Sequence, residues 1–180
     1  MLTSELWDAC GDFHGHKCPG LAIGFKAVEG AVEELGLDID NPSIDEELVC
    51  VTENDACGTD AVQRLLGCTY GKGNLIPRLR GKMAFSFFDR LTGRGVRLCL
   101  KPRIEDGKTR DEAMRYLLER PYTELFDISK PSYALPEQAR LFNSQLCAKC
   151  GEETAEYALR FQNRQPVCLD CYDAYQREGF

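Results

Sequence analysis

Two histidines and a cysteine lie close together near the N-terminus, in a chain that contains no other histidine. The stretch CGDFHGHKCPGLAIGF holds His14, His16 and Cys18. Imidazole and thiolate ligands together suit zinc, nickel, copper or iron. Cys18 directly precedes Pro19, which favours the first turn of a helix, and the N-terminus of a helix stabilises a thiolate. The stretch therefore predicts a metal site or a reactive thiol, against the alternative of histidines that only satisfy backbone groups.

The segment NDACGTDAVQ adds side chains of the same chemistry. Cys57 precedes a helix that we expect to begin near Thr59, so it occupies the same kind of position as Cys18. We expect Cys57 to be a second sulfur beside Cys18, with one histidine as co-ligand or base and with Asp60 as an acid–base or supporting group. The residues that we predict for catalysis are Cys18, His16, Cys57 and Asp60.

A glycine-rich loop, GCTYGKGNL, brings Cys68, Lys72 and Asn74 into the set of candidates. Lys72 lies between two glycines, but the Ser or Thr that follows the lysine of a phosphate-binding P-loop is absent, so nucleotide binding is not indicated here. Three further cysteines, Cys10, Cys50 and Cys99, fall among apolar neighbours and are expected to be buried, because free cysteine behaves as a small hydrophobic residue.

Four cysteines form two CxxC motifs near the C-terminus: Cys147, Cys150, Cys168 and Cys171. Two CxxC turns joined by a hairpin give a tetrahedral site of four sulfurs, the preferred geometry of structural zinc. Gly151 follows the first turn, where a left-handed backbone is often needed. An iron centre of the rubredoxin kind, a redox-active CxxC pair or four merely structural cysteines are the alternatives. With four cysteine ligands no position stays open for a substrate, so we expect a structural site.

Composition and charge narrow the class of protein. The 180 residues carry a net charge of −7, and the module from residue 144 onward holds four basic against six acidic residues. Nucleic-acid phosphates attract the opposite sign, so the charge disfavours a nucleic-acid partner and favours a protein partner. No apolar run is long enough to span a membrane, and no signal peptide is recognisable. Ten cysteines in such a chain indicate a cytoplasmic protein with metal or redox chemistry.

Hydrophobic periodicity predicts the elements that would position these residues. We expect helices over residues 4–13, 19–35, 59–66 and 109–120, capped by Ser4 and Thr59 in the first and third. A strand at 47–54 and two strands around the turn LTGRG, forming a hairpin, complete the set. Gly24 and Gly30 weaken the second helix, so another part of the backbone should pack closely there.

The fold class that these elements indicate is α+β. We expect a mixed helix and antiparallel-sheet core domain over residues 1–135 and a linker at 136–143. A small treble-cysteine-knuckle zinc ribbon then occupies residues 144–180. About 35 residues cannot fold on a hydrophobic core alone, so the metal would supply the folding free energy of the ribbon.

Taken together, FHGHKCPGLAIGFKA, NDACGTDAVQ, GCTYGKGNL and the CxxC…CxxC tail resemble the family of the formylmethanofuran dehydrogenase E subunit. The resemblance runs from about residue 10 through the hairpin, and the tail is similar to that of members with a zinc ribbon. It implies an α+β core, a C-terminal zinc finger and a tightly intertwined homodimer. It also implies a cleft lined by the motif residues His14, His16, Cys18, Cys57, Asp60, Gln63, Cys68, Lys72 and Asn74.

Two classes of function follow. The first is a metal-binding protein with a structural zinc ribbon and a Cys/His cleft that binds a second transition metal or acts through a thiolate, as an accessory to a molybdenum or tungsten oxidoreductase. The resemblance implies that the pterin-bound metal and the iron–sulfur clusters belong to other subunits. The alternative is a metal- or redox-sensing adaptor whose ribbon contacts a partner protein.

Overall fold

The computed structural model describes residues 2–102 and 106–175, so the last five residues of the expected ribbon module lie outside the described residues. The chain divides into two compact units, Met1–Ala139 and Arg140–Phe180. The first unit combines helices with a mainly antiparallel sheet, and the second carries the four clustered cysteines, which confirms the α+β class with a small zinc-ribbon fold. Within the described ranges, no helix is long and apolar enough to cross a membrane.

The first unit contains a five-stranded sheet with the order β2-β1-β3-β4-β5. The β1–β3, β3–β4 and β4–β5 pairs are antiparallel, and β1–β2 is parallel. The hairpin predicted around LTGRG is β3–β4, and the predicted strand at 47–54 is β1. The strands are β1 (Leu48–Thr52), β2 (Leu75–Pro77), β3 (Ala84–Asp89), β4 (Gly95–Leu100) and β5 (Phe126–Ser129).

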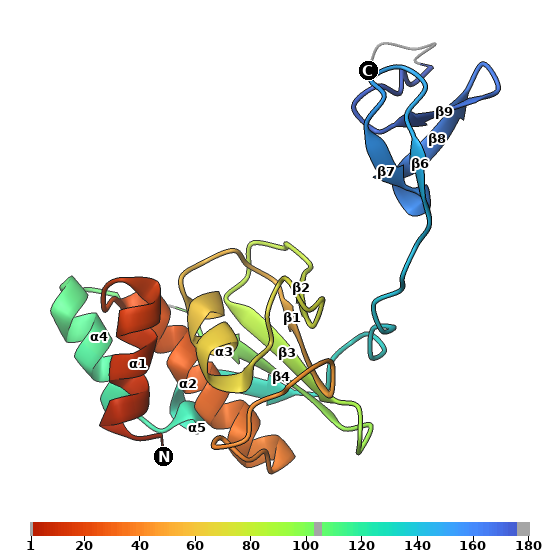
Figure 1. Ribbon diagram of the computed structural model, residues 1–180. Helices are drawn as coiled ribbons and strands as arrows, with labels where there is room; N and C mark the ends of the chain where they lie inside the picture. Colours follow the sequence, from red (N-terminus) through yellow and green to blue (C-terminus); the bar gives the residue numbers. More distant parts are fainter. Residues whose placement is uncertain (1, 103–105, 176–180) are drawn as a thin grey trace. The chain divides into compact units, whose positions relative to one another are not determined.

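The helices described for this unit gather on one face of the sheet (Figure 1). Two predicted caps are wrong. Thr3, not Ser4, accepts the capping hydrogen bond from Leu6 N, because the helix already includes Ser4. The third helix begins at Gly58 with Cys57 at its N-cap, and the Thr59 hydroxyl donates back to the carbonyl of Ala56 instead. The helices are α1 (Ser4–His14), α2 (Pro19–Leu35), α3 (Gly58–Leu66), α4 (Arg110–Glu119) and α5 (Tyr122–Leu125).

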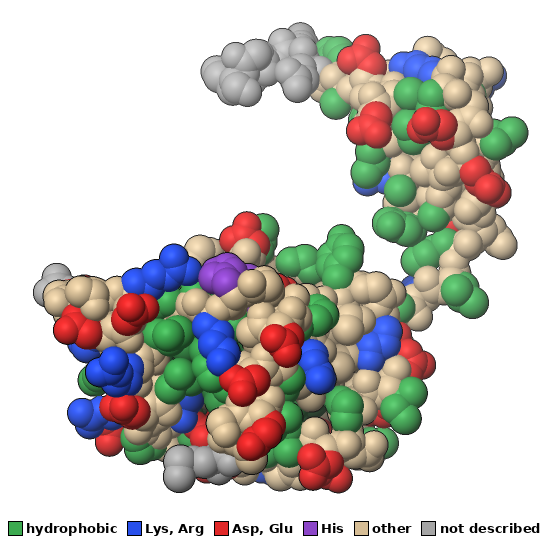
Figure 2. Space-filling view, turned by 60° about the vertical axis from the view of Figure 1, so that its left-hand side comes forward, with side chains coloured by type: hydrophobic (Ala, Val, Ile, Leu, Met, Phe, Trp, Pro, Cys, Tyr) green, Lys and Arg blue, Asp and Glu red, His purple; other side chains and the backbone are tan. Residues whose placement is uncertain are grey.

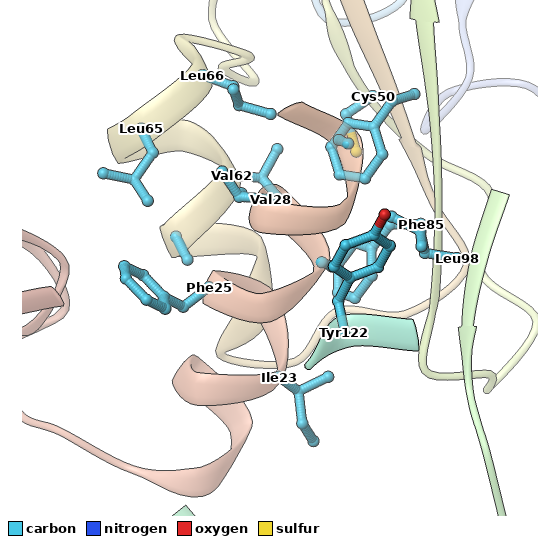
Figure 3. Close-up of a cluster of buried hydrophobic side chains, with 14 of the residues drawn as sticks. Ile23, Phe25, Val28, Cys50, Val62, Leu65, Leu66, Phe85, Leu98 and Tyr122 are labelled. Carbon is cyan, nitrogen blue, oxygen red and sulfur yellow. The ribbon is translucent and has the colours of Figure 1, made fainter. Parts of the chain in front are cut away.

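Helix α2 is the centre of the first unit. It begins at Pro19 and ends at Gly36, which has a left-handed φ of 72° as its C-cap, and it is buried on almost every side. Figure 3 shows the apolar side chains of α2 between α3 and the sheet. Val28 lies among Val62 of α3 and Phe85 and Leu98 of the sheet, all of them fully buried. A helix enclosed in this way positions its N-terminal residues as firmly as the core itself.

Two glycines allow α2 and α3 to touch through their backbones. A Cβ added to Gly24 would overlap the carbonyl group of Gly58, and a Cβ added to Gly58 would lie 3.0 Å from the backbone of Gly20 and Gly24. At Gly30 the close neighbours are side chains and not the predicted backbone, since a Cβ there would lie 2.9 Å from the ring of Tyr122 and 3.0 Å from Leu98. Only glycine lets helices cross at this distance.

The other face of the sheet carries none of the described helices and is partly covered by the chain that follows β5. Tyr133 and Leu135 pack against Val49, Val51 and Phe88, which point away from the helices. Further on, the backbone N–H of Ala139 donates to the Glu46 carboxylate at 3.0 Å, and the Arg90 guanidinium donates to the carbonyl of Pro136 at 2.8 Å. The first residues of the segment expected as a linker therefore pack on the first unit.

The second unit consists of two short hairpins. β6 pairs with β7, and β8 pairs with β9 through a two-residue turn in which Asn163 and Arg164 have positive φ. Such a turn matches the twist of a tight hairpin. The elements are β6 (Ser144–Leu146), β7 (Glu153–Ala155), the 3-10 helix η1 (Glu156–Ala158), β8 (Leu159–Gln162) and β9 (Gln165–Cys168).

The glycine contact leads to a first prediction. Gly24→Ala should lower the free energy of unfolding by about 3 kcal/mol, because the new Cβ overlaps the backbone of α3 and must push the two helices apart. Gly71→Ala is the control, since a Cβ at Gly71 meets nothing within 4 Å and its φ is not positive. Urea unfolding followed by circular dichroism measures both variants, and equal stability of the two would contradict the packing described above.

Candidate metal centres

Three side chains of the first unit form the core cluster, which we define as His14, Cys18 and Cys57. One ligand atom from each lies within 4.8 Å of the other two. His14 is the last residue of α1, Cys18 is the N-cap of α2, and Cys57 is the N-cap of α3. The cluster therefore forms where three helix ends meet, although its members come from two separate sequence motifs.

The two cysteines lie where backbone amides and helix dipoles favour negative charge. The Cys18 sulfur accepts a hydrogen bond from the backbone N–H of Leu21 at 3.3 Å, so the thiol itself caps α2. Cys57 makes no side-chain capping bond, and its Cβ lies 3.3 Å from the Cβ that Gly20 would carry. The amide dipoles at a helix start favour negative charge, and the thiolate is the form in which cysteine binds metals.

Asp60 fixes the orientation of the His14 ring. Its Oδ2 lies 2.7 Å from His14 Nδ1, and its Oδ1 accepts a hydrogen bond from the Gln63 amide at 3.1 Å. In the tautomer with the proton on Nδ1, His14 donates a hydrogen bond to Asp60 and keeps a free lone pair on Nε2, which lies 3.9 Å from Cys18 Sγ. A histidine that binds a metal through one ring nitrogen usually donates a hydrogen bond from the other to a carboxylate, and His14 is arranged in this way.

His16 lies beside the core cluster without belonging to it. Its ring centre is 4.6 Å from that of His14, and the side chain is exposed. Figure 2 shows histidine at the surface of this unit. The structure therefore places the two predicted histidines differently, His14 in the core cluster and His16 at the surface beside it.

The electrostatics of the core cluster suit a bound cation. Partial burial and the neighbouring Cys18 sulfur raise the pKa of the Cys57 thiol, because a second negative charge there would be poorly solvated. A metal ion removes that penalty, since it binds thiolates directly. The donor set of one imidazole nitrogen and two sulfurs fits a borderline-soft ion such as zinc, and three ligands leave one tetrahedral position open.

Three other candidate residues are not brought to the core cluster and hold their own loop together. The Cys68 thiol is fully buried, donates to the carbonyl of Leu48 at 3.5 Å, and has its pKa raised to about 12 by burial. The Asn74 amide donates to the same carbonyl at 2.9 Å. The Lys72 ammonium donates to the carbonyl of Ser43 at 2.7 Å. Carbonyl groups of an irregular loop need hydrogen-bond donors of this kind. In the sequence, polar residues that supply them resemble the residues of a ligand-binding motif.

The cysteines assigned to the core differ in burial. Cys10 and Cys50 are fully buried, as predicted, and burial raises the pKa of both thiols, that of Cys10 to about 11. Cys99 is only half-buried, because β4 carries it on the face of the sheet away from the described helices. All ten cysteines lie in the described ranges, and none is disulfide-bonded.

The four cysteines of the second unit form the ribbon cluster. Their sulfurs all lie within 4.8 Å of one another. Gly151 follows the first CxxC turn with a φ of 77°, the left-handed backbone predicted for it, and its N–H donates to the carbonyl of Cys147. The members are Cys147, Cys150, Cys168 and Cys171.

Backbone amides prepare the ribbon cluster for a cation. Hydrogen bonds from the N–H groups of Cys150 and Cys168 lower the pKa of the Cys147 thiol to about 6. A hydrogen bond with the Cys168 sulfur, together with desolvation, raises the pKa of Cys171 to about 12, because both favour the neutral thiol. Four thiolates can share this space only around a metal ion, so the donor set fits a closed four-sulfur site.

Comparisons with known proteins agree with this architecture. Residues 13–140 match the family model described as FmdE, molybdenum formylmethanofuran dehydrogenase operon. The crystal structure of an FmdE-like protein of tungsten formylmethanofuran dehydrogenase type, from Syntrophus aciditrophicus, superposes with a TM-score of 0.63 at 24% identity, over 93% of this chain and 90% of that one. At this identity the likeness concerns the fold.

A curated relative extends the comparison at the sequence level. A probable S-adenosyl-L-methionine-binding protein of Archaeoglobus fulgidus is 29% identical over 91% of this chain. The chain spans about half the length of that relative, 51%. The family model covers the core cluster, Asp60 and the central helix α2 and matches well over half of the residues, so the chain belongs to the FmdE family.

Proposed function

We propose that the first unit binds one transition metal ion, zinc in the first place, through His14 Nε2 and the sulfurs of Cys18 and Cys57. The observation that carries this proposal is the meeting of these three atoms within 4.8 Å, beside a histidine that Asp60 orients. A reactive thiol would also use a histidine base that a carboxylate orients, so the His14–Asp60 bond suits both chemistries. The second sulfur, from Cys57, close to the same histidine favours the metal. The coarser conclusion, a metal-binding member of the FmdE family, rests on the family match and the two clusters.

The proposed site is of the open kind. When bound, a metal ion with three protein ligands supplies Lewis acidity to an oxygen or a water in its fourth position. The residues around it divide the remaining work. Asp60 holds the His14 ring and its tautomer, Gln63 holds Asp60, and the exposed His16 gives or takes a proton at its ring nitrogen. Cys18 and Cys57 keep the site at the helix starts.

We propose zinc for the ribbon cluster as well, in a structural role. The second unit has only a small buried group, Cys147, Val167 and Cys168, which is too little apolar surface to fold so short a chain. Metal binding then supplies the folding free energy. Iron in the same four-sulfur site remains the inorganic alternative, because the geometry suits both ions.

The setting of the protein belongs to the same proposal. Ten described cysteines without a disulfide suit a reducing compartment, which favours the cytoplasm. Membership in the FmdE family supports a role as a homodimeric accessory to a molybdenum or tungsten oxidoreductase. In that role, this chain would contribute the metal ions bound at its two clusters.

An adaptor function is the second candidate, and exposed apolar side chains of the second unit favour it. Leu146, Tyr157, Phe161 and Leu169 are each more than half exposed, on a unit that carries a net negative charge. Such side chains are typical of surfaces that contact another protein. In this function the core cluster would sense the metal and the ribbon would contact the partner, without turnover.

Metal content separates the two clusters. Elemental mass spectrometry of the native protein should find two ions per protomer, and Cys18→Ser should retain one, because serine is a poor ligand for soft ions. Stability should change little, since a serine hydroxyl can replace the sulfur as the N-cap of α2. The control Cys10→Ser removes a buried thiol outside the clusters and should retain both ions. One ion in the wild type, lost in Cys147→Ser/Cys150→Ser, would contradict a metal at the core cluster.

The support given by Asp60 can be tested separately. Asp60→Asn should weaken metal binding at the core cluster by about tenfold to a hundredfold, because the carboxylate that orients His14 and raises its basicity is lost. Competition with a chromogenic chelator measures the affinity. Asp55→Asn is the matched control, an exposed carboxylate in the same segment. Equal affinities of the two variants would show that the His14–Asp60 bond does not serve the metal.

A third test concerns the ribbon. Cys168→Ser should unfold the second unit and leave the first one folded, because only the second depends on its metal for folding. Hydrogen exchange should show lost protection across residues 144–171 and unchanged protection in α2. Cys99→Ser serves as the control for the loss of one thiol. Loss of protection in α2 of Cys168→Ser would mean that the two units do not fold independently.

A further inference from the structure

A cationic groove lies at the end of β1, on the face of the sheet away from the described helices. The cavity has a volume of about 320 Å³. Its lining includes five cations, Arg78, Arg80, Lys82, Arg97 and Lys130, and one carboxylate, Glu53. The groove thus carries a charge of +4 on a chain whose net charge is −7. These residues are not among the candidates predicted from the sequence, because their only local signal is the alternation of cations in RLRGK.

The single carboxylate of the groove is already neutralised. Glu53 accepts two hydrogen bonds from the Arg97 guanidinium, at 2.7 and 3.0 Å, and both side chains are largely buried. Hydrogen bonding by Arg97 lowers the pKa of Glu53, so the pair stays ionised. A buried, bidentate pair of this kind holds both side chains in a fixed position within the groove. The other cations therefore face solvent without an acidic partner in the lining.

Backbone hydrogen bonds hold three of these cations in place. The N–H of Arg78 donates to the carbonyl of Thr52 at 2.8 Å, and those of Arg80 and Lys82 donate to the carbonyl of Glu53. The carbonyl of Lys82 in turn accepts from the buried Asn54 amide at 3.1 Å. The loop is thus fastened to the end of β1, and the backbone that carries these side chains needs little ordering when a ligand binds.

Hydroxyl groups lie in the lining of the groove and beside it. Among the described residues, the Ser86 hydroxyl and the Tyr133 hydroxyl are buried without a hydrogen-bond partner. Ser86 lies directly opposite Arg97 in the β3–β4 register, and the Arg78 guanidinium stacks on the Tyr133 ring at 4.3 Å. Neither Ser86 nor Tyr133 belongs to the lining, so the hydroxyl donors that a ligand in the groove can reach are those of Ser129 and Ser132.

We propose that this groove binds a small molecule through its phosphate groups. A ligand with two or more negative charges matches a cluster of several cations better than a ligand that carries one carboxylate. Guanidinium groups bind phosphate oxygens in a bidentate manner, and hydroxyl donors complete the coordination of the remaining oxygens. The volume lies at the lower end of known ligand sites, which suits a phosphate-bearing part of a ligand. This binding site does not depend on the metal proposed for the core cluster.

Titration calorimetry with sodium pyrophosphate tests the groove on the full chain. Arg80→Gln/Lys82→Gln should weaken binding by about tenfold, because two of the four unpaired charges are removed. Both side chains are exposed, so the variant should keep the wild-type melting temperature, and Lys130→Gln provides a second variant. Arg110→Gln/Arg115→Gln on α4 removes the same charge elsewhere and should bind like the wild type.

Further control experiments test whether pyrophosphate binds in the groove or elsewhere on the chain. Cys18→Ser should bind pyrophosphate like the wild type, since the core cluster is not involved. The proposal fails if the wild type shows no saturable binding at millimolar pyrophosphate, or if Cys18→Ser abolishes binding while Arg80→Gln/Lys82→Gln retains it. It also fails if succinate binds as tightly as pyrophosphate, or if a single-stranded oligonucleotide displaces pyrophosphate at far lower concentration, because the ligand would then belong to another class.

Discussion

The backbone contact between Gly24 of α2 and Gly58 of α3 is the constraint on which the first unit depends. No side chain separates the two helices there, so the start of α3 lies directly against α2. Because Cys18 and Cys57 are the N-caps of these helices, the same contact brings two sulfurs together. The core cluster is therefore a product of helix packing, and the surrounding apolar residues of α2 fix it in place (Figure 3).

The two clusters use sulfur in opposite ways. The ribbon cluster surrounds its centre with four cysteines on short hairpins, and little else holds that unit together. The core cluster has only three donors, stands on a packed core and is backed by Asp60 and Gln63. A closed set of ligands suits a structural ion, whereas an open set on a rigid frame suits an ion that meets a substrate.

Local patterns in the sequence predicted the parts of this structure that depend on local rules. The apolar stripe of α2, its start at Pro19, the β3–β4 hairpin and the close approach at Gly24 all follow from such patterns. The role of Asn74 did not, because a residue that satisfies loop carbonyls resembles one that binds a ligand. The cationic groove was missed for another reason. Its charges come from separate segments, and each one alone resembles an ordinary solvated side chain.

The spacing of the ligands along the chain also affects when each site can form. The ribbon cysteines lie within one short stretch and can gather around an ion before any other part of the chain is ordered. The core ligands are supplied by three helices, and closing the long loop between Cys18 and Cys57 requires that α3 already lies on α2. With the metals proposed above, the ribbon would compete for its ion while the chain is still unfolded, and intrinsic affinity would decide the outcome. The core would select its ion later, through the geometry that the finished fold imposes.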